Sequence, residues 1–138
     1  MNQLSATVTD IQKSDNLSIV SFEAYGQALH MVSLELDDSL VIGSEVTLSA
    51  KATKIALAKN IDSELSISNQ IDVTVESINN GLLLGSIKLR FGEALLESII
   101  TRESSVRMNL QAKEKLTALI QASDLSILKI NGKAGNHE

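Results

Sequence analysis

The sequence contains no cysteine and no tryptophan, and only one tyrosine and two phenylalanines occur among its 138 residues. Without cysteine there is neither a disulfide framework nor a thiolate metal site, which fits a reducing compartment. The shortage of aromatic rings removes the stacking platforms that bind nucleic-acid bases, and the net charge of −5 opposes a phosphate backbone. The composition therefore predicts no direct nucleic-acid partner.

Long apolar runs are also missing, since no stretch approaches the roughly 18 residues that a membrane-spanning helix requires. The first residues, Met1–Ser5, lack the basic start and apolar core of a signal peptide. We therefore expect a cytoplasmic protein with no membrane partner. Proline is absent altogether, and no pattern in the chain explains this.

What the chain does contain is an internal repeat. Residues 2–11 and 69–78 share five identities at an offset of 67, and residues 46–55 resemble residues 116–125 at an offset of 70. The repeat predicts one module at 1–60, a linker at 61–65, a second module at 66–130 and a disordered tail at 131–138. A unit of about 65 residues buries only about 60% of its unfolded surface, so we expect modules or chains to pack together.

Each copy shows the period-two alternation of half-buried β-strands. Apolar and polar residues alternate along 4–9 and again along 71–76. Hairpin turns are predicted at Lys13–Asn16, at Asn79–Gly81, and where Tyr25–Leu29 aligns with Phe91–Leu95.

A short helix is expected at 103–108, with a shorter counterpart at 37–40. Segments 55–58 and 125–130 are expected to extend the last strand of their own copies. The predicted fold class is all-β, with two tandem OB-like five-stranded barrels that each carry a short helix.

Short polar motifs occur at the ends of the predicted strands. They are Ser66-Ile67-Ser68-Asn69-Gln70, Thr101-Arg102-Glu103-Ser104, Lys51-Ala52-Thr53 and Gln121-Ala122-Ser123. In this combination and order, they resemble the motifs of the molbindin family, whose module is the TOBE or Mop domain. The resemblance covers most of the chain as a tandem pair. It implies a homo-oligomer that binds molybdate or tungstate between modules or subunits.

The chemistry of such a ligand explains the residue types. A tetrahedral dianion presents only acceptor oxygens, so it requires several converging hydroxyl, backbone N–H or cationic donors. Small residues in the motifs allow the backbone to approach the ligand. The resemblance implies an oxyanion site formed from Lys51, Ala52, Thr53, Ser66, Ser68, Thr101, Ser104, Gln121, Ala122 and Ser123, with no metal ligand and no catalytic cofactor.

The motifs also depart from the family pattern. Ser68 stands where the family has arginine, and Gln121 stands where it has lysine. The first copy begins at Met1 without the opening triplet, and 32–35 replaces its middle motif. Each lost bond to a charged group weakens binding by about 1.5–3 kcal/mol.

Each candidate also has an ordinary structural interpretation. Lys51 fits a solvated lysine at a strand end, and Thr53 and Ser123 fit turn hydroxyls that bond to their own backbone. Thr101 and Ser104 fit the cap of the short helix, which is compatible with ligand contact. Arg102 is expected to pair with an acid such as Glu103 or Glu97.

Catalytic chemistry is not indicated. His30 falls in a predicted strand and His137 in the tail, and no nucleophile has a plausible base. No glycine-rich phosphate loop occurs. The predicted function is non-enzymatic binding of molybdate or tungstate for storage, buffering or sensing. The alternative is a TOBE interaction module that has lost binding and that oligomerises or regulates a transporter ATPase or a transcription regulator.

Overall fold

The computed structural model describes residues 1–62 and 64–133, and its elements are almost entirely β-strands. The elements are β1 (Asn2–Ser14), β2 (Leu17–Ala24), β3 (Gln27–Ser33), β4 (Ser44–Ala50), the 3-10 helix η1 (Ala52–Lys54), β5 (Ala56–Ala58), β6 (Asn69–Asn80), β7 (Leu84–Phe91), β8 (Ala94–Thr101), α1 (Arg102–Arg107), β9 (Lys115–Ile120), the 3-10 helix η2 (Ala122–Asp124) and β10 (Ser126–Lys133).

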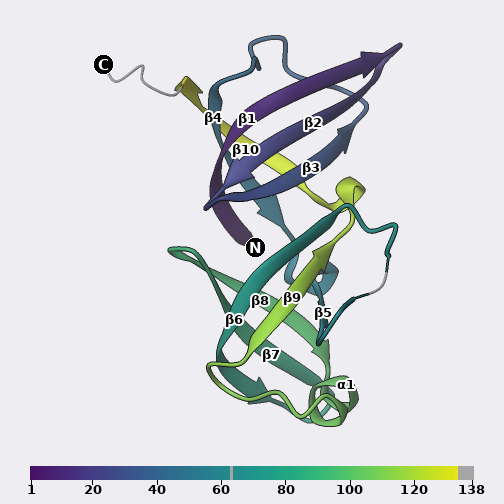
Figure 1. The fold of residues 1–138 in the computed structure, drawn as a ribbon, viewed down its shortest axis with the longest axis vertical. Coiled ribbons are helices and arrows are strands. Elements are labelled where there is room, and N and C mark those ends of the chain that lie inside the picture. The colour runs from purple at the N-terminus through teal and green to yellow at the C-terminus, as the bar shows by residue number, and fades with distance from the viewer. Residues whose placement is uncertain (63, 134–138) are drawn as a thin grey trace.

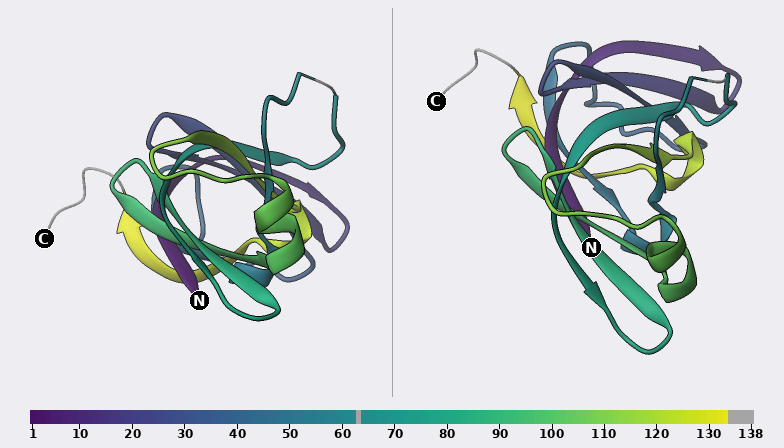
Figure 2. Two further views of the ribbon diagram at one scale, coloured as in Figure 1. Left: turned by 90° about the horizontal axis from the view of Figure 1, so that it is seen from below. Right: turned by 60° about the horizontal axis from the view of Figure 1, so that its bottom comes forward.

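Two five-stranded antiparallel sheets lie end to end (Figure 1). The first has the strand order β10-β4-β1-β2-β3, and the second has the order β5-β9-β6-β7-β8. Viewed from below, the strongly curved strands of the two sheets overlap in projection and surround the centre of the view (Figure 2). The predicted class, all-β with two OB-like five-stranded modules in tandem, is confirmed.

The two modules exchange their fifth strands. We expected 55–58 and 125–130 to extend their own copies, and this is wrong: β5 pairs with β9 of the second sheet, and β10 pairs with β4 of the first. The 3-10 turns η1 and η2 redirect the chain after β4 and β9, so that each strand leaves its own module. The first sheet therefore combines residues 2–50 with the end of the chain.

The strand exchange affects the module boundaries that we predicted from the internal repeat. The division at 61–65 remains a prediction, and sheet membership crosses it through β5 and β10. Residues 131–133, which we placed in the tail, are the end of β10. The rest of the predicted tail, 134–138, lies outside the described residues.

Period-two alternation produces the core. On β1, Leu4, Ala6 and Val8 are buried, while their neighbours face outward. The second copy repeats the pattern on β6 with the same spacing. Buried side chains of both modules belong to one continuous hydrophobic cluster, which includes Phe22 and Phe91. The boundary between the two modules, which we call the seam, is therefore apolar at its centre and continuous with the hydrophobic core.

The observed hairpin turns show that our alignment of the two copies was wrong by one residue in this region. Tyr25 and Gly26 form the turn of the first copy, whereas Gly92 and Glu93 form the turn of the second. The structural offset is thus 67 through this region, not the 66 that matched Tyr25-Gly26 to Phe91-Gly92. Positive φ angles at Tyr25 (51°), Gly26 (79°) and Gly92 (58°) set these tight turns.

Helix α1 begins at the predicted cap. The Thr101 hydroxyl accepts a hydrogen bond from the Ser104 backbone N–H at 3.1 Å. In the first copy, residues 37–40 form a turn closed by the Leu40 N–H to Asp37 carbonyl bond of 3.0 Å. None of the helices among the described residues is long and apolar enough to cross a membrane.

Candidate functional site

Two asparagines hold the seam between the modules. The Asn69 side chain donates to the His30 carbonyl at 2.9 Å and accepts from the His30 N–H at 2.7 Å. Asn2 makes the same pair of bonds with the Glu97 backbone, at 2.8 and 2.7 Å. Each amide thus satisfies one residue on the outer strand, β3 or β8, of the opposite module.

These two contacts are equivalent under the repeat. Asn2 and Asn69 differ by 67 residues, as do Glu97 and His30. The strand exchange obeys the same relation, because β4 receives β10 and β9 receives β5. The asparagine contacts and the exchanged strands of the seam are therefore related by a pseudo-two-fold axis.

The polar part of the seam lies where β4 passes into η1 and β9 passes into η2. Lys51 is the extended residue before η1, with φ −71° and ψ 139°, and Gln121 has the same place before η2 with φ −63° and ψ 144°. A 3-10 helix has about three residues per turn, so residues three apart lie on one side. Lys51 and Lys54 are thus directed to the same side of the first corner.

A polar cavity of about 230 Å³ opens at this corner. A space of this size holds a small ion together with several waters, since one water takes about 30 Å³. It is lined by Met1, Ser49, Ala50, Lys51, Lys54, Ser123, Asp124 and Ser126.

The charge and donor content of the cavity suit an anion. Its lining residues include two lysines against one aspartate, Asp124, and three serines whose hydroxyls are neutral donors. In the described part of the chain, ion pairs are formed by Lys59, Lys88, Arg90 and Arg107, and neither lysine of the cavity takes part in one.

A second polar cavity of about 360 Å³ adjoins the first through Met1 and carries Ala52 on its wall. Its cation, Lys88, is paired with Glu97 at 3.5 Å. The hydroxyl of Ser86 donates to the Glu97 carboxylate, and this bond, more than Lys88, holds the pKa of Glu97 below its ordinary value. With its charge already balanced, this cavity is the weaker candidate for an anion.

The structure brings together only some of the predicted site residues. Lys51 and Ser123 line one cavity, although they come from different copies. Ala52 and Thr53 lie on η1, and Gln121 and Ala122 lie at the start of η2. Ser66 and Ser68 are exposed in the segment before β6.

Thr101 and Ser104 are placed apart from this corner. They lie at the start of α1, at the far end of the second module, whereas the chain begins between the two sheets (Figure 1). Ser104 also accepts a bond from Arg107 at 3.1 Å. Their hydroxyls therefore serve the helix start, as the capping interpretation predicted.

Arg102 does not form the ion pair we expected. Its guanidinium donates to the Gly81 carbonyl at 3.2 Å, while Glu103 pairs with Arg107 at 2.8 Å. The side chain thus ties α1 to the β6–β7 hairpin.

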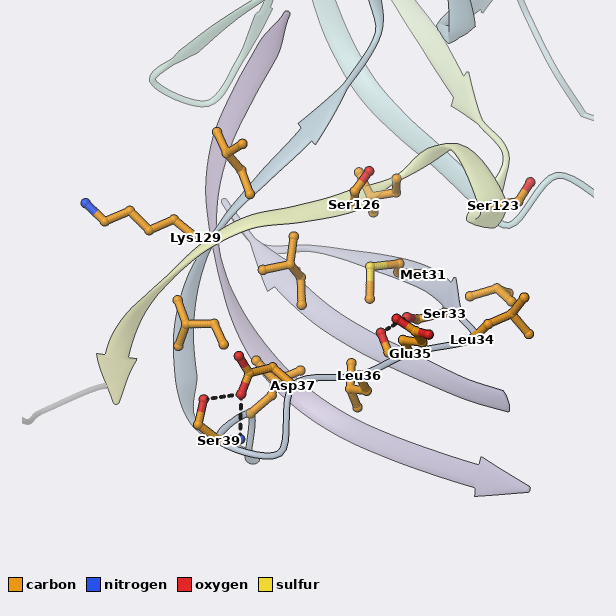
Figure 3. A pocket seen from close by; sticks show the side chains of 16 residues that line it. Met31, Ser33, Leu34, Glu35, Leu36, Asp37, Ser39, Ser123, Ser126 and Lys129 are labelled. Atoms are coloured by element: carbon orange, nitrogen blue, oxygen red, sulfur yellow. Dashed lines mark hydrogen bonds between the residues drawn. The ribbon is translucent and has the colours of Figure 1, made fainter. Parts of the chain in front are cut away.

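A larger cavity, of about 1020 Å³, shares Ser123 and Ser126 with the polar cavity but is mostly apolar. Figure 3 shows it between β3 with its following loop and β10, with Met31 and Leu36 directed inward. Asp37 bonds to Ser39 at its rim, through the backbone N–H at 2.8 Å and the hydroxyl at 2.7 Å. These bonds lower the pKa of Asp37. An apolar groove with an acidic rim does not suit a dianion.

Sequence reasoning missed three donor residues of the polar cavity, Ser49, Lys54 and Ser126, and also its carboxylate, Asp124. Lys54 could have been predicted from the sequence, since its spacing from Lys51 fits one 3-10 turn. Ser126 was not, because it reaches the cavity only through the exchange that pairs it with Ser49. Among the described residues, no three His, Cys, Asp or Glu side chains gather in a way that would hold a metal ion.

Comparison with known proteins shows a close likeness in fold. No protein-family model matches the chain, and no curated protein matches it. The fold is similar to that of ModG, a cytoplasmic molybdate-binding protein crystallised with molybdate bound. The TM-score is 0.84 at 25% identity, over 91% of this chain and 94% of that chain. This likeness supports the resemblance to the molbindin family that the sequence motifs indicated.

Another solved structure that matches part of the chain is a molybdate-binding protein from Sporomusa ovata, at 28% identity and a TM-score of 0.47. It covers 49% of this chain and 100% of its own. In the present chain, residues with hydroxyl and ammonium donors gather at the η1 corner.

Proposed function

We propose that this protein binds one class of ligand, a tetrahedral oxyanion such as molybdate or tungstate, in the seam cavity beside Lys51. The observation that carries the proposal is the convergence of two ammonium groups and three hydroxyls on one small hollow between the modules. Likeness in fold to ModG, whose structure holds molybdate, supports the choice of anion.

The mechanism of binding follows from the donor set. Lys51 and Lys54 supply the charge, and Ser49, Ser123 and Ser126 supply directed hydrogen bonds to the oxygens. Sulfate has the same charge and geometry, so selectivity over sulfate comes from the larger radius of the metal oxyanion. The ligand leaves unchanged, which fits storage, buffering or sensing in the cytoplasm.

The proposal predicts heat of binding in titration calorimetry with molybdate and tungstate, and weaker heat with sulfate, using protein stripped of anion. Lys51→Ala should weaken molybdate binding about tenfold or more, because it removes a charge-assisted contact. Lys13→Ala, which removes the same charge from an exposed position on β1, is the matched control. An absence of heat with both metal oxyanions would refute the proposal.

The second candidate is an interaction module. Its support is an exposed apolar surface formed by the β6–β7 hairpin tip and α1, where Leu82, Leu83 and Val106 lie. Such patches mark contact sites. Leu83→Asp would abolish assembly in light scattering if this surface joins chains, and would leave anion binding unchanged.

A further inference from the structure

The pseudo-two-fold axis gives the seam two equivalent corners, one at η1 and one at η2. The strand register defines the equivalence residue by residue. Ser49 on β4 lies opposite Ser126 on β10, and Leu119 on β9 lies opposite Ala56 on β5. These two cross-strand pairs occupy the same place under the repeat.

The two pairs differ in chemistry. At the first corner the pair is two serines, and the Ser49 side chain lines the polar cavity although the residue is only 4% exposed. At the second corner, the leucine fills the equivalent place and is 9% exposed. Two hydroxyl donors are thus replaced by a leucine side chain and a methyl group, neither of which can bond to an oxyanion.

The charges differ in the same direction. Lys51 of the first corner corresponds to Gln121 of the second. Lys54 and Asp124 correspond to each other under the repeat, and both line the first cavity. The first corner therefore has two ammonium groups against one carboxylate, whereas at the second corner the neutral amide of Gln121 stands in place of the Lys51 ammonium.

We infer that the two seam corners have diverged, so that each chain binds one oxyanion at the Lys51 corner and none at the Gln121 corner. This inference rests on the proposed function and adds its stoichiometry. Ser49, Lys51 and Ser126 are the residues that distinguish the competent corner from its pseudo-symmetric counterpart.

The consequence for binding is large. A dianion that enters the second corner loses a charge-assisted contact and leaves oxygens facing an apolar side chain. Each lost bond to a charged group weakens binding by about tenfold or more. With three donors replaced, occupancy at micromolar molybdate disappears at that corner.

The test is a reciprocal graft between the corners. The double variant Ser49→Leu/Lys51→Gln gives the first corner two of the three residues that distinguish the second. The triple variant Ala56→Ser/Leu119→Ser/Gln121→Lys gives the second corner the residues of the first. Bound molybdate per chain is measured by equilibrium dialysis with elemental analysis, alongside circular dichroism to confirm that each variant is folded.

We expect one molybdate per chain in the unmodified protein, none in the double variant and two in the triple variant. Two molybdates per chain in the unmodified protein, or unchanged binding in the folded double variant, would overturn the inference while leaving oxyanion binding intact. A folded triple variant that gains no site would show that these residues are not the difference. Absence of binding in the unmodified protein would instead refute the proposed function itself.

Discussion

Asn69 shows how one side chain serves both the fold and the site. It has 0% exposure, and both polar groups of its amide are used by the His30 backbone. Its removal would leave a backbone N–H and a carbonyl unpaired in a partly buried place. Unsatisfied groups of this kind cost about 1–3 kcal/mol each.

Asn69→Ala is therefore expected to lower the free energy of unfolding by about 2–4 kcal/mol, measured by urea denaturation. Asn2→Ala removes the symmetric contact and should act in the same direction. Gln70→Ala is the control, since that side chain is exposed and bonds only to the nearby Ile67 carbonyl. Its effect should stay within about 0.5 kcal/mol. Equal effects at Asn69 and Gln70 would contradict a role for the amide.

The carboxyl group of Glu97 makes the stability of the fold depend on pH. The Ser86 hydroxyl lowers the pKa of this carboxyl below its ordinary value of 4.5. A group whose pKa is lowered on folding stabilises the fold above the pKa of the unfolded chain. That contribution is lost as the pH falls through the lower folded-state pKa.

Ser86→Ala should thus reduce the free energy of unfolding by about 1 kcal/mol at pH 7, and by much less near pH 2, where Glu97 is protonated in both states. Chemical denaturation at both pH values measures the difference. Ser77→Ala, at an exposed serine on the adjacent strand, should show no such dependence. A loss that is the same at both pH values would exclude the carboxylate as its cause.

Residue-level chemistry was partly visible in the sequence. The Thr101 cap followed from a hydroxyl placed before a short helix, a local signal that needs no tertiary information. Lys51 was visible through its motif. Ser49 was not, because a serine inside an apolar strand gives no sign that its side chain lines a cavity.

At the scale of elements, the strands followed from alternation, but their partners did not. The pattern at 55–58 is the same whichever sheet receives it, since period two specifies a face and not a neighbour. A 3-10 turn at η1 decides the direction of exit. The exchange was therefore outside the reach of single-sequence reasoning.

The two β-hairpin turns beside the seam meet through Tyr25 and Phe91, whose rings are 5.3 Å apart in an edge-to-face arrangement. Gly92 lies beneath Tyr25: a Cβ at this position would come 2.3–2.7 Å from three Tyr25 side-chain atoms, one of them its Cβ. Gly26 has a similar positive φ, but nothing lies within 4 Å of the equivalent Cβ. A comparison of substitutions at Gly26 and Gly92 therefore separates the cost of backbone strain from the cost of a steric clash.

Gly26→Ala should cost about 1–2 kcal/mol of unfolding free energy through its left-handed conformation alone. Gly92→Ala adds the clash with the tyrosine ring, and should cost about 1–3 kcal/mol more by the measure of overpacked sites. Thermal or urea unfolding of both variants checks the difference. Equal costs would show that Tyr25 moves away without penalty.

At the scale of the whole molecule, the exchange joins the two modules into one cooperative unit. Each sheet lacks its fifth strand unless the other module is folded, and the buried side chains form one cluster across the seam. Partial unfolding of one module would expose the edge of the other, together with both asparagine contacts.

We therefore expect a single two-state unfolding transition, not two separate ones. The calorimetric enthalpy should equal the van't Hoff enthalpy, and backbone amides in β4 and β9 should exchange hydrogen with the same free energy of opening. Asn69→Ala should lower the free energy of opening equally in β4 and β9, because both modules unfold as one unit and a destabilised contact on one side of the seam affects both. Protection that falls in only one module would show that the sheets unfold independently in spite of the exchanged strands.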